Sequence, residues 1–170
     1  MGGGVRKCVK HCLIKEKNIC YSNHKIGEEA IYSYQVLRHA KSVGFIDLPV
    51  YCYMLHDDSL SHTKVDDPWG EVAKTLRELV KSQGDYPTYA NTLNAFIKTA
   101  TVVSIMKIAQ HHPYTLFVKK ANERVKLMQD TTDCDYGTDW QHAPKKANAL
   151  MQLAQFRCWP IIWVMCRLRR

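Results

Sequence analysis

Two adjacent glutamates are the clearest candidates for chemistry in the sequence. Glu28 and Glu29 directly follow Gly27 and stand where an apolar repeat typical of a helix begins. A carboxylate at a helix N-terminus can act as a general base that takes a proton from a hydroxyl group. Two acids in a first helical turn also stabilise the helix dipole without doing any chemistry. Both interpretations of the pair stay open at this level.

A second pattern is the acidic loop over residues 129–141, which contains Asp133-x-Asp135. Such a pair of aspartates can hold a divalent cation against a pyrophosphate group. The glycine and the terminal glutamate of a calcium-binding EF-hand loop are not in register with these aspartates. We therefore interpret the segment as a solvated acidic loop.

Cysteine and histidine side chains near the N-terminus raise the question of a metal site. Cys8, His11 and Cys12 are close in sequence, but structural zinc sites usually combine two ligand pairs, and no second pair follows. The seven cysteines are an odd number, and the chain opens without a recognisable secretory signal peptide. These features favour reduced thiols in a cytoplasmic protein without a zinc site.

The composition of the chain is that of a globular protein, whose helices and strands must position these residues. The chain has 170 residues, of which 46% are hydrophobic and 24% charged, as in soluble folded domains. Its net charge of +8 is uneven, because residues 1–63, 64–142 and 143–170 carry +2, 0 and +6. We expect two parts, residues 1–63 and a helical C-terminal domain over residues 64–170 that ends in a basic, tryptophan-containing tail.

Hydrophobic spacing predicts an α+β, mostly helical protein. A short exposed helix is expected within residues 5–19 and a longer one over about 28–42. Short extended runs over residues 45–47 and 50–54 flank a proline, which excludes one continuous central strand. Three amphipathic helices that pack antiparallel are expected next, the first capped by Asp67. They cover about residues 68–83, 88–111 and 114–129.

The C-terminal segment 145–170 mixes apolar, tryptophan and basic residues. Its apolar run over residues 158–166 is nine residues long, which is too short for a bilayer-spanning helix of about 20 residues. Tryptophan and arginine together suit a membrane interface with anionic lipid. The alternative is that the segment packs on the helical domain. The candidate interface residues are Trp159, Trp163, Arg167, Arg169 and Arg170.

Four pieces of the first 63 residues stand in an order that resembles a known family. The pieces are residues 14–19, the helix start at 27–34, the run 44–53, and the Asp-Ser-Leu-Ser-His-Thr segment 58–63. Together they resemble the C-terminal part of family 2 glycosyltransferases, such as bacterial enzymes that build polysaccharides and cell-wall glycans. The resemblance implies a C-terminal remnant of the GT-A α/β fold, here one helix and two short strands, ahead of the helical bundle.

The resemblance also implies roles for individual side chains. Glu29 takes the position of the general base that deprotonates an acceptor hydroxyl as it attacks a nucleotide sugar. Its side chain is one methylene longer than the aspartate of the family. Glu28, His56, Ser61 and His62 would lie on the acceptor or donor side, and His62 could also ligate a metal.

The resemblance leaves one half of the enzyme unaccounted for. Relatives place a Rossmann-like nucleotide-binding half, ending in an Asp-x-Asp that holds Mn²⁺ or Mg²⁺, ahead of the matching segment. The Asp133-x-Asp135 pair follows that segment and cannot take its place. We therefore expect a transferase fragment for a glycan or lipid-linked acceptor, inactive without the other half, in the cytoplasm or at the inner face of the cell membrane.

The alternative is a noncatalytic module that binds a membrane surface or another protein. Nucleic acid is a poorer partner for the basic tail, because no zinc-finger, helix-turn-helix or RNA-recognition signature accompanies it.

Overall fold

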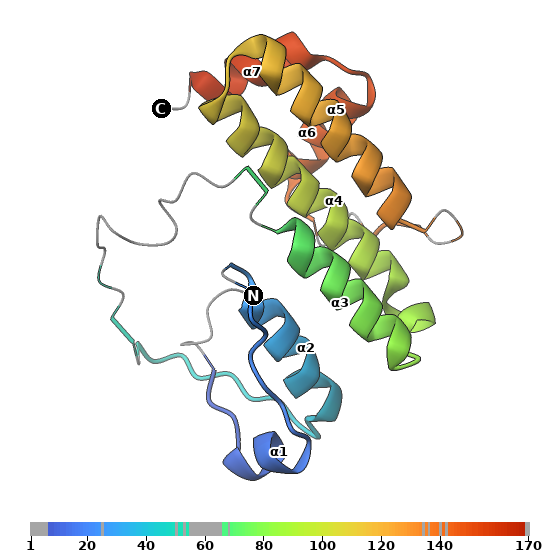
Figure 1. Cartoon of the computed structure of the whole chain (residues 1–170). Helices are drawn as coiled ribbons and strands as arrows, with labels where there is room; N and C mark the ends of the chain where they lie inside the picture. The colour runs from blue at the N-terminus through green and yellow to red at the C-terminus, as the bar shows by residue number, and fades with distance from the viewer. Residues whose placement is uncertain are drawn as a thin grey trace. The chain divides into compact units, whose positions relative to one another are not determined.

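The computed structural model in Figure 1 describes residues 7–24, 26–49, 51–52, 54, 66–67, 69–133, 135, 137–139, 141 and 143–168. These residues form seven α-helices and no β-strand. The chain divides into two compact units, here named the N-terminal unit (residues 1–63) and the helical unit (residues 64–170). The prediction of a mostly helical protein is confirmed.

The described part of the N-terminal unit contains two short helices. They are α1 (His11–Glu16) and α2 (Glu28–His39), so α2 ends about three residues earlier than predicted. The buried residues Ile19, Tyr32 and Val36 form its small core. Partly buried apolar side chains of α1 and the segment before it pack against this core, namely Val9, Leu13 and Ile14. The core therefore fixes which face of α2 points inward.

The two short strands expected after α2 are not supported by the structure. Residues 43–49, 51–52 and 54, which are the described part of this stretch, contain no strand. Phe45 is 98% exposed, and Ile46 and Leu48 are also exposed. An extended run becomes a strand when its backbone groups pair with a second strand, and the described chain provides none. The β part of the expected GT-A remnant is therefore missing from the described residues.

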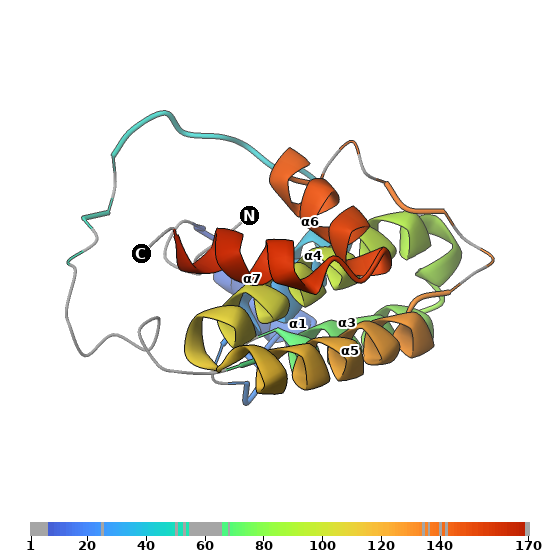
Figure 2. The ribbon, with the colours of Figure 1, turned by 90° about the horizontal axis from the view of Figure 1, so that it is seen from above.

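The helical unit packs its helices around one central member. Figure 1 shows α3, α4 and α5 as successive antiparallel neighbours, and Figure 2 shows α7 lying across α4. The central helix α4 contacts each of the others. The helices are α3 (Gly70–Ser82), α4 (Tyr86–His111), α5 (Tyr114–Thr131), α6 (Lys145–Gln155) and α7 (Trp159–Arg167).

The position of α4 explains its composition. Its buried residues include apolar and small side chains on every side, as expected for a helix enclosed by neighbours. Among the described helices it is the one long and apolar enough to cross a membrane. However, 61% of its most apolar window is buried in the structure. These properties are typical of the core helix of a bundle.

The helix ends follow local signals in the sequence. The N-cap position of α3 is Trp69 and not Asp67 as predicted, because the helix begins two residues later. Asp67 still accepts a hydrogen bond from the backbone N–H of Gly70, the first residue of the helix, at 3.0 Å. Pro113 separates α4 from α5. The predicted C-terminal segment is two helices, α6 and α7, joined by a turn in which Arg157 has a φ of 54°.

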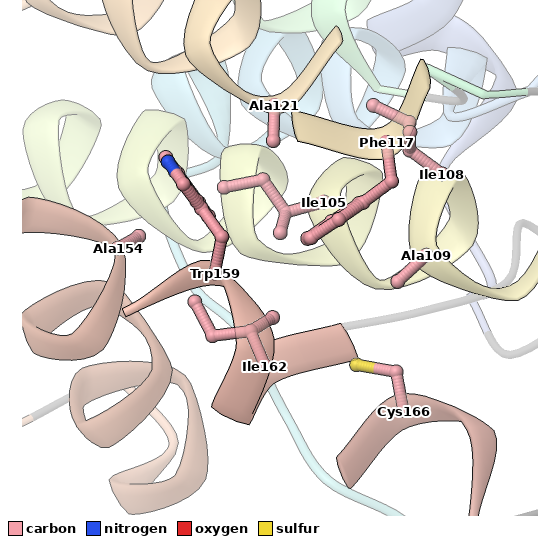
Figure 3. Close-up of a cluster of buried hydrophobic side chains, with 9 residues drawn as sticks. All are labelled: Ile105, Ile108, Ala109, Phe117, Ala121, Ala154, Trp159, Ile162 and Cys166. Atoms are coloured by element: carbon pink, nitrogen blue, oxygen red, sulfur yellow. The ribbon is translucent and has the colours of Figure 1, made fainter. Parts of the chain in front are cut away.

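The main core lies where α4, α5 and α7 meet. Figure 3 shows Trp159 and Ile162 of α7 pointing toward Ile105 of α4 and Phe117 of α5. The rings of Phe117 and Trp159 meet edge to face, with centroids 5.9 Å apart. Phe117 and Ile162 have no exposed surface. One face of the C-terminal apolar run, the inner face of α7, is thus part of the core of the helical unit.

Candidate functional site

The predicted base, Glu29, lies in the first turn of α2. Gly27 precedes this turn with a φ of 81°, a left-handed conformation that favours glycine. Glu28 and Glu29 are therefore the first two residues of the helix, and both side chains are half-buried. The first-turn N–H groups and the helix dipole favour negative charge here. Both glutamates thus keep part of their surface exposed to solvent.

A pair of stacked tyrosines lies beside the two glutamates. The rings of Tyr21 and Tyr32 are parallel within 2°, with centroids 4.3 Å apart. Tyr32 is buried in the small core, whereas Tyr21 is half-exposed. Burial, the neighbouring Tyr32, and the charges of Glu28 and Glu29 together raise the pKa of the Tyr21 hydroxyl. The site thus joins an exposed aromatic ring to two carboxylates.

Two further side chains hold the start of α2 in place. Lys7 Nζ donates a hydrogen bond to Ser33 Oγ at 2.7 Å, and Ser33 Oγ donates to the backbone carbonyl of Glu29. This chain of contacts links the segment before α1 to the first turn of α2. Sequence reasoning missed Lys7, Ser33 and Tyr21. Ser33 carried a signal, because its spacing of four residues from Glu29 allows this bond on a helix.

The other residues assigned by resemblance have no described geometry. His56, Ser61 and His62 lie outside the described residues, and so do Arg169 and Arg170 of the tail. Their roles stay predictions. Of the residues predicted to act as base or to lie on the acceptor or donor side, the described part of the chain includes Glu28 and Glu29, which are neighbours in sequence.

The aromatic and basic residues expected at a membrane interface have other contacts. Trp159 is 5% exposed within the core. Trp163 Nε1 donates to the carbonyl of His112 at 3.4 Å. Arg167 stacks over the Trp163 ring and donates to the carbonyls of Ala109 and His112 at 3.2 and 2.8 Å.

These contacts give the three side chains a structural role. The last carbonyls of α4 lack helical partners and carry partial negative charge, so Trp163 and Arg167 cap the C-terminus of that helix. Trp159 cannot reach a membrane interface while the helical unit stays folded.

The acidic loop is attached to α4 through its backbone. Buried Asn94 donates to the carbonyls of Asp133 and Gly137, both at 3.2 Å. The Asp133 carboxylate accepts the backbone N–H of Asp135 at 3.1 Å. Within the described parts of the chain, no three histidine, cysteine or acidic side chains are grouped so that they could hold a metal ion. Asp133 and Asp135 thus shape a turn in this structure.

A second charged cluster lies where the start of α3 meets α4 and α5. Asp66 accepts hydrogen bonds from His112 at 2.9 Å and from Lys120 at 2.5 Å. Partial burial acts to raise the pKa of Asp66, but these two donors outweigh it and hold the pKa below its usual value. A neighbouring pair joins Asp67 to Arg124 at 2.9 Å. Both carboxylates are thus engaged with basic side chains at the end of α4 or on α5.

Comparison with known proteins adds no relative from which a role could be transferred. No family model, no curated protein and no solved structure matches the chain. The chemistry of the site therefore rests on its own residues and on the motif order described above.

Proposed function

We propose that the N-terminal unit is the acceptor side of an inverting glycosyltransferase of the family 2 type. In this proposal Glu29 is the general base, and the nucleotide-binding half is supplied from outside these 170 residues, in cis or in trans. The acceptor is a glycan or a lipid-linked sugar. The order of the four motif pieces over residues 13–63 gives the proposal its family.

One structural observation supports the proposal most directly. Glu28 and Glu29 occupy the first turn of α2, directly after Gly27 and beside the Tyr21–Tyr32 stack. An exposed tyrosine ring can pack against the apolar face of a sugar while its hydroxyl group forms a hydrogen bond. A neighbouring carboxylate can then accept the proton of a sugar hydroxyl as that oxygen attacks.

The divalent cation of the proposal belongs to the complete enzyme, since the described residues include no group of three histidine, cysteine or acidic side chains arranged for a metal. In the complete enzyme such a cation would neutralise charge on the departing nucleoside diphosphate. Three of the described aspartates are engaged in other contacts, because Asp66 and Asp67 are paired with cations and Asp133 holds a turn. The step assigned to this chain is therefore proton removal and acceptor positioning.

Glycosyl transfer by a completed enzyme tests the proposed base. The chain is joined to, or co-expressed with, a family 2 nucleotide-binding half, and sugar transfer from labelled UDP-sugars is measured. Glu29→Gln is expected to lower transfer by about 100-fold or more, which is the scale of losing a general base. Glu28→Gln is the matched control, one residue away in the same helical turn, and is expected to cost less.

The pair of variants also shows how the proposal would fail. Equal losses for Glu28→Gln and Glu29→Gln, or full activity for Glu29→Gln, would contradict the assignment of the base. Tyr21→Phe and Tyr21→Ala separate the ring from the hydroxyl, since the proposal expects a larger rise in the acceptor KM for alanine. Circular dichroism of each variant controls for loss of α2.

A further inference from the structure

Helix α7 has two apolar faces, and one of them faces solvent. Trp159, Ile162 and Cys166 form the inner face and are buried. The outer side chains recur at positions i, i+3, i+4 and i+7, a spacing that places them along one side of a helix. This outer group, together with the exposed ring that precedes the helix, is named the α7 stripe: Phe156, Ile161, Val164, Met165 and Leu168.

The α7 stripe is strongly exposed for an apolar surface. Phe156 and Leu168 are each 80% exposed, and Ile161 is 51% exposed. Single exposed apolar residues are common, but Ile161, Val164, Met165 and Leu168 follow one side of α7, and such a contiguous set marks an interaction surface. The inner face already anchors α7 to α4 and α5, so the stripe is not needed to hold the helix in place.

The surroundings of the stripe favour a flat partner. The hollow beside it, lined by Met106, Leu150 and Met165 among others, has a volume of only about 20 Å³. That volume is close to what one water molecule needs. A docked peptide helix or a small molecule requires a groove or a cavity, whereas a bilayer surface requires neither.

The charge of the same segment indicates the kind of surface. Residues 143–170 contain six lysines and arginines and no acidic residue. A second copy of the chain would bring another +6 segment against this one, so charge opposes self-association through the stripe. Exposed Lys145, Lys146 and Arg157 belong to this segment, and an anionic lipid surface complements their charge.

From these observations we propose that the α7 stripe docks on a bilayer that contains anionic lipids. The apolar side chains enter the boundary between headgroups and acyl chains, and the basic residues of the segment attract the headgroups. Trp163 and Arg167 keep α7 attached to the C-terminus of α4, so docking requires no unfolding. This inference concerns the helical unit and does not depend on the proposed transferase activity.

Co-sedimentation of the full chain with vesicles tests the docking surface. Vesicles that contain phosphatidylglycerol are compared with pure phosphatidylcholine vesicles at low salt. We expect binding to phosphatidylglycerol that weakens when salt rises from about 0.1 to about 1 M, because the Debye length falls from about 10 to about 3 Å. Ile161→Ser combined with Leu168→Ser is expected to weaken binding by about tenfold or more.

A matched variant separates the stripe from general surface hydrophobicity. Leu127 on α5 is 50% exposed, almost the same as Ile161. Leu116→Ser with Leu127→Ser therefore removes exposed apolar surface elsewhere on the helical unit and should leave vesicle binding unchanged. Urea unfolding of both double variants checks that the fold is intact.

Three outcomes would overturn the proposal. The first is no binding to phosphatidylglycerol vesicles at low salt. The second is an equal loss in the stripe and control variants. The third is a dimer in sedimentation-velocity experiments that Ile161→Ser converts to a monomer, since the stripe would then be covered by a second copy of the chain.

Discussion

Replacing Trp159 by alanine should lower the unfolding free energy of the helical unit far more than replacing its exposed neighbour Phe156 by alanine. Trp159 is 5% exposed and packs edge to face on Phe117, whereas Phe156 is 80% exposed three residues earlier. Truncating a buried tryptophan to alanine costs about 3–5 kcal/mol of unfolding free energy, because contacts are lost and a cavity remains. Phe156→Ala should change the unfolding free energy by about 0.5 kcal/mol or less.

Tryptophan fluorescence during urea unfolding is the suitable assay. All four tryptophans, at positions 69, 140, 159 and 163, lie in the helical unit, so the signal does not report the N-terminal unit. The three that remain in Trp159→Ala still report unfolding. A single domain has an unfolding free energy of about 5–15 kcal/mol. The expected loss is a large fraction of that free energy, so it lowers the urea midpoint by a similarly large fraction of its parent value.

The comparison can fail in an informative way. If Trp159→Ala and Phe156→Ala shift the midpoint equally little, Trp159 does not pack in the core, and it would be free to enter a membrane, which is one of the two interpretations that the sequence left open. The same two variants also separate folding from docking. Phe156→Ala is expected to weaken vesicle binding while leaving stability almost unchanged.

Two further predictions concern pH and nucleotide binding. The pKa of Asp66 is held below its usual value of 3.8 in the folded state, so its ion pairs contribute stability above about pH 4 that is lost as pH falls through the lower folded pKa. In urea titrations at pH 7 and pH 3, Asp66→Asn should therefore be destabilised at pH 7 and should lose less stability on acidification than the parent chain; an equal loss in both proteins would contradict the role of these ion pairs. The chain alone should bind a UDP-sugar with Mn²⁺ more weakly than about 1 mM, or about −4 kcal/mol, because the described residues form no nucleotide-binding sheet. Micromolar affinity in calorimetry would show that this chain holds the nucleotide itself.

The positions of most helices could be predicted from the sequence alone. The regular apolar spacing after Asp67, the proline at position 113 and the pair of acids after Gly27 each act within a few residues. Such local signals can be recognised from a few neighbouring residues, without knowledge of the rest of the fold. The first turn of α2, which carries Glu28 and Glu29, was predictable for the same reason.

The extended runs after α2 show a feature that local sequence patterns cannot predict, namely whether an extended run pairs into a strand. β-branched and aromatic residues favour extended backbone, but a strand exists only when a second strand accepts its hydrogen bonds. Phe45 and Ile46 are exposed, and the described residues contain no strand with which they could pair. A pattern of a few residues cannot say whether that partner is available.

Only the tertiary structure decided which residues meet across long separations. Asp66 pairs with His112 and Lys120, which are 46 and 54 residues away. The run from Cys158 to Cys166 is apolar on every side, so the sequence could not tell that Trp159 is buried and Ile161 exposed. Periodicity distinguishes two faces only where polar residues mark one of them. Packing against α4 and α5 made that choice, because those helices offer apolar surface to one face of α7 alone.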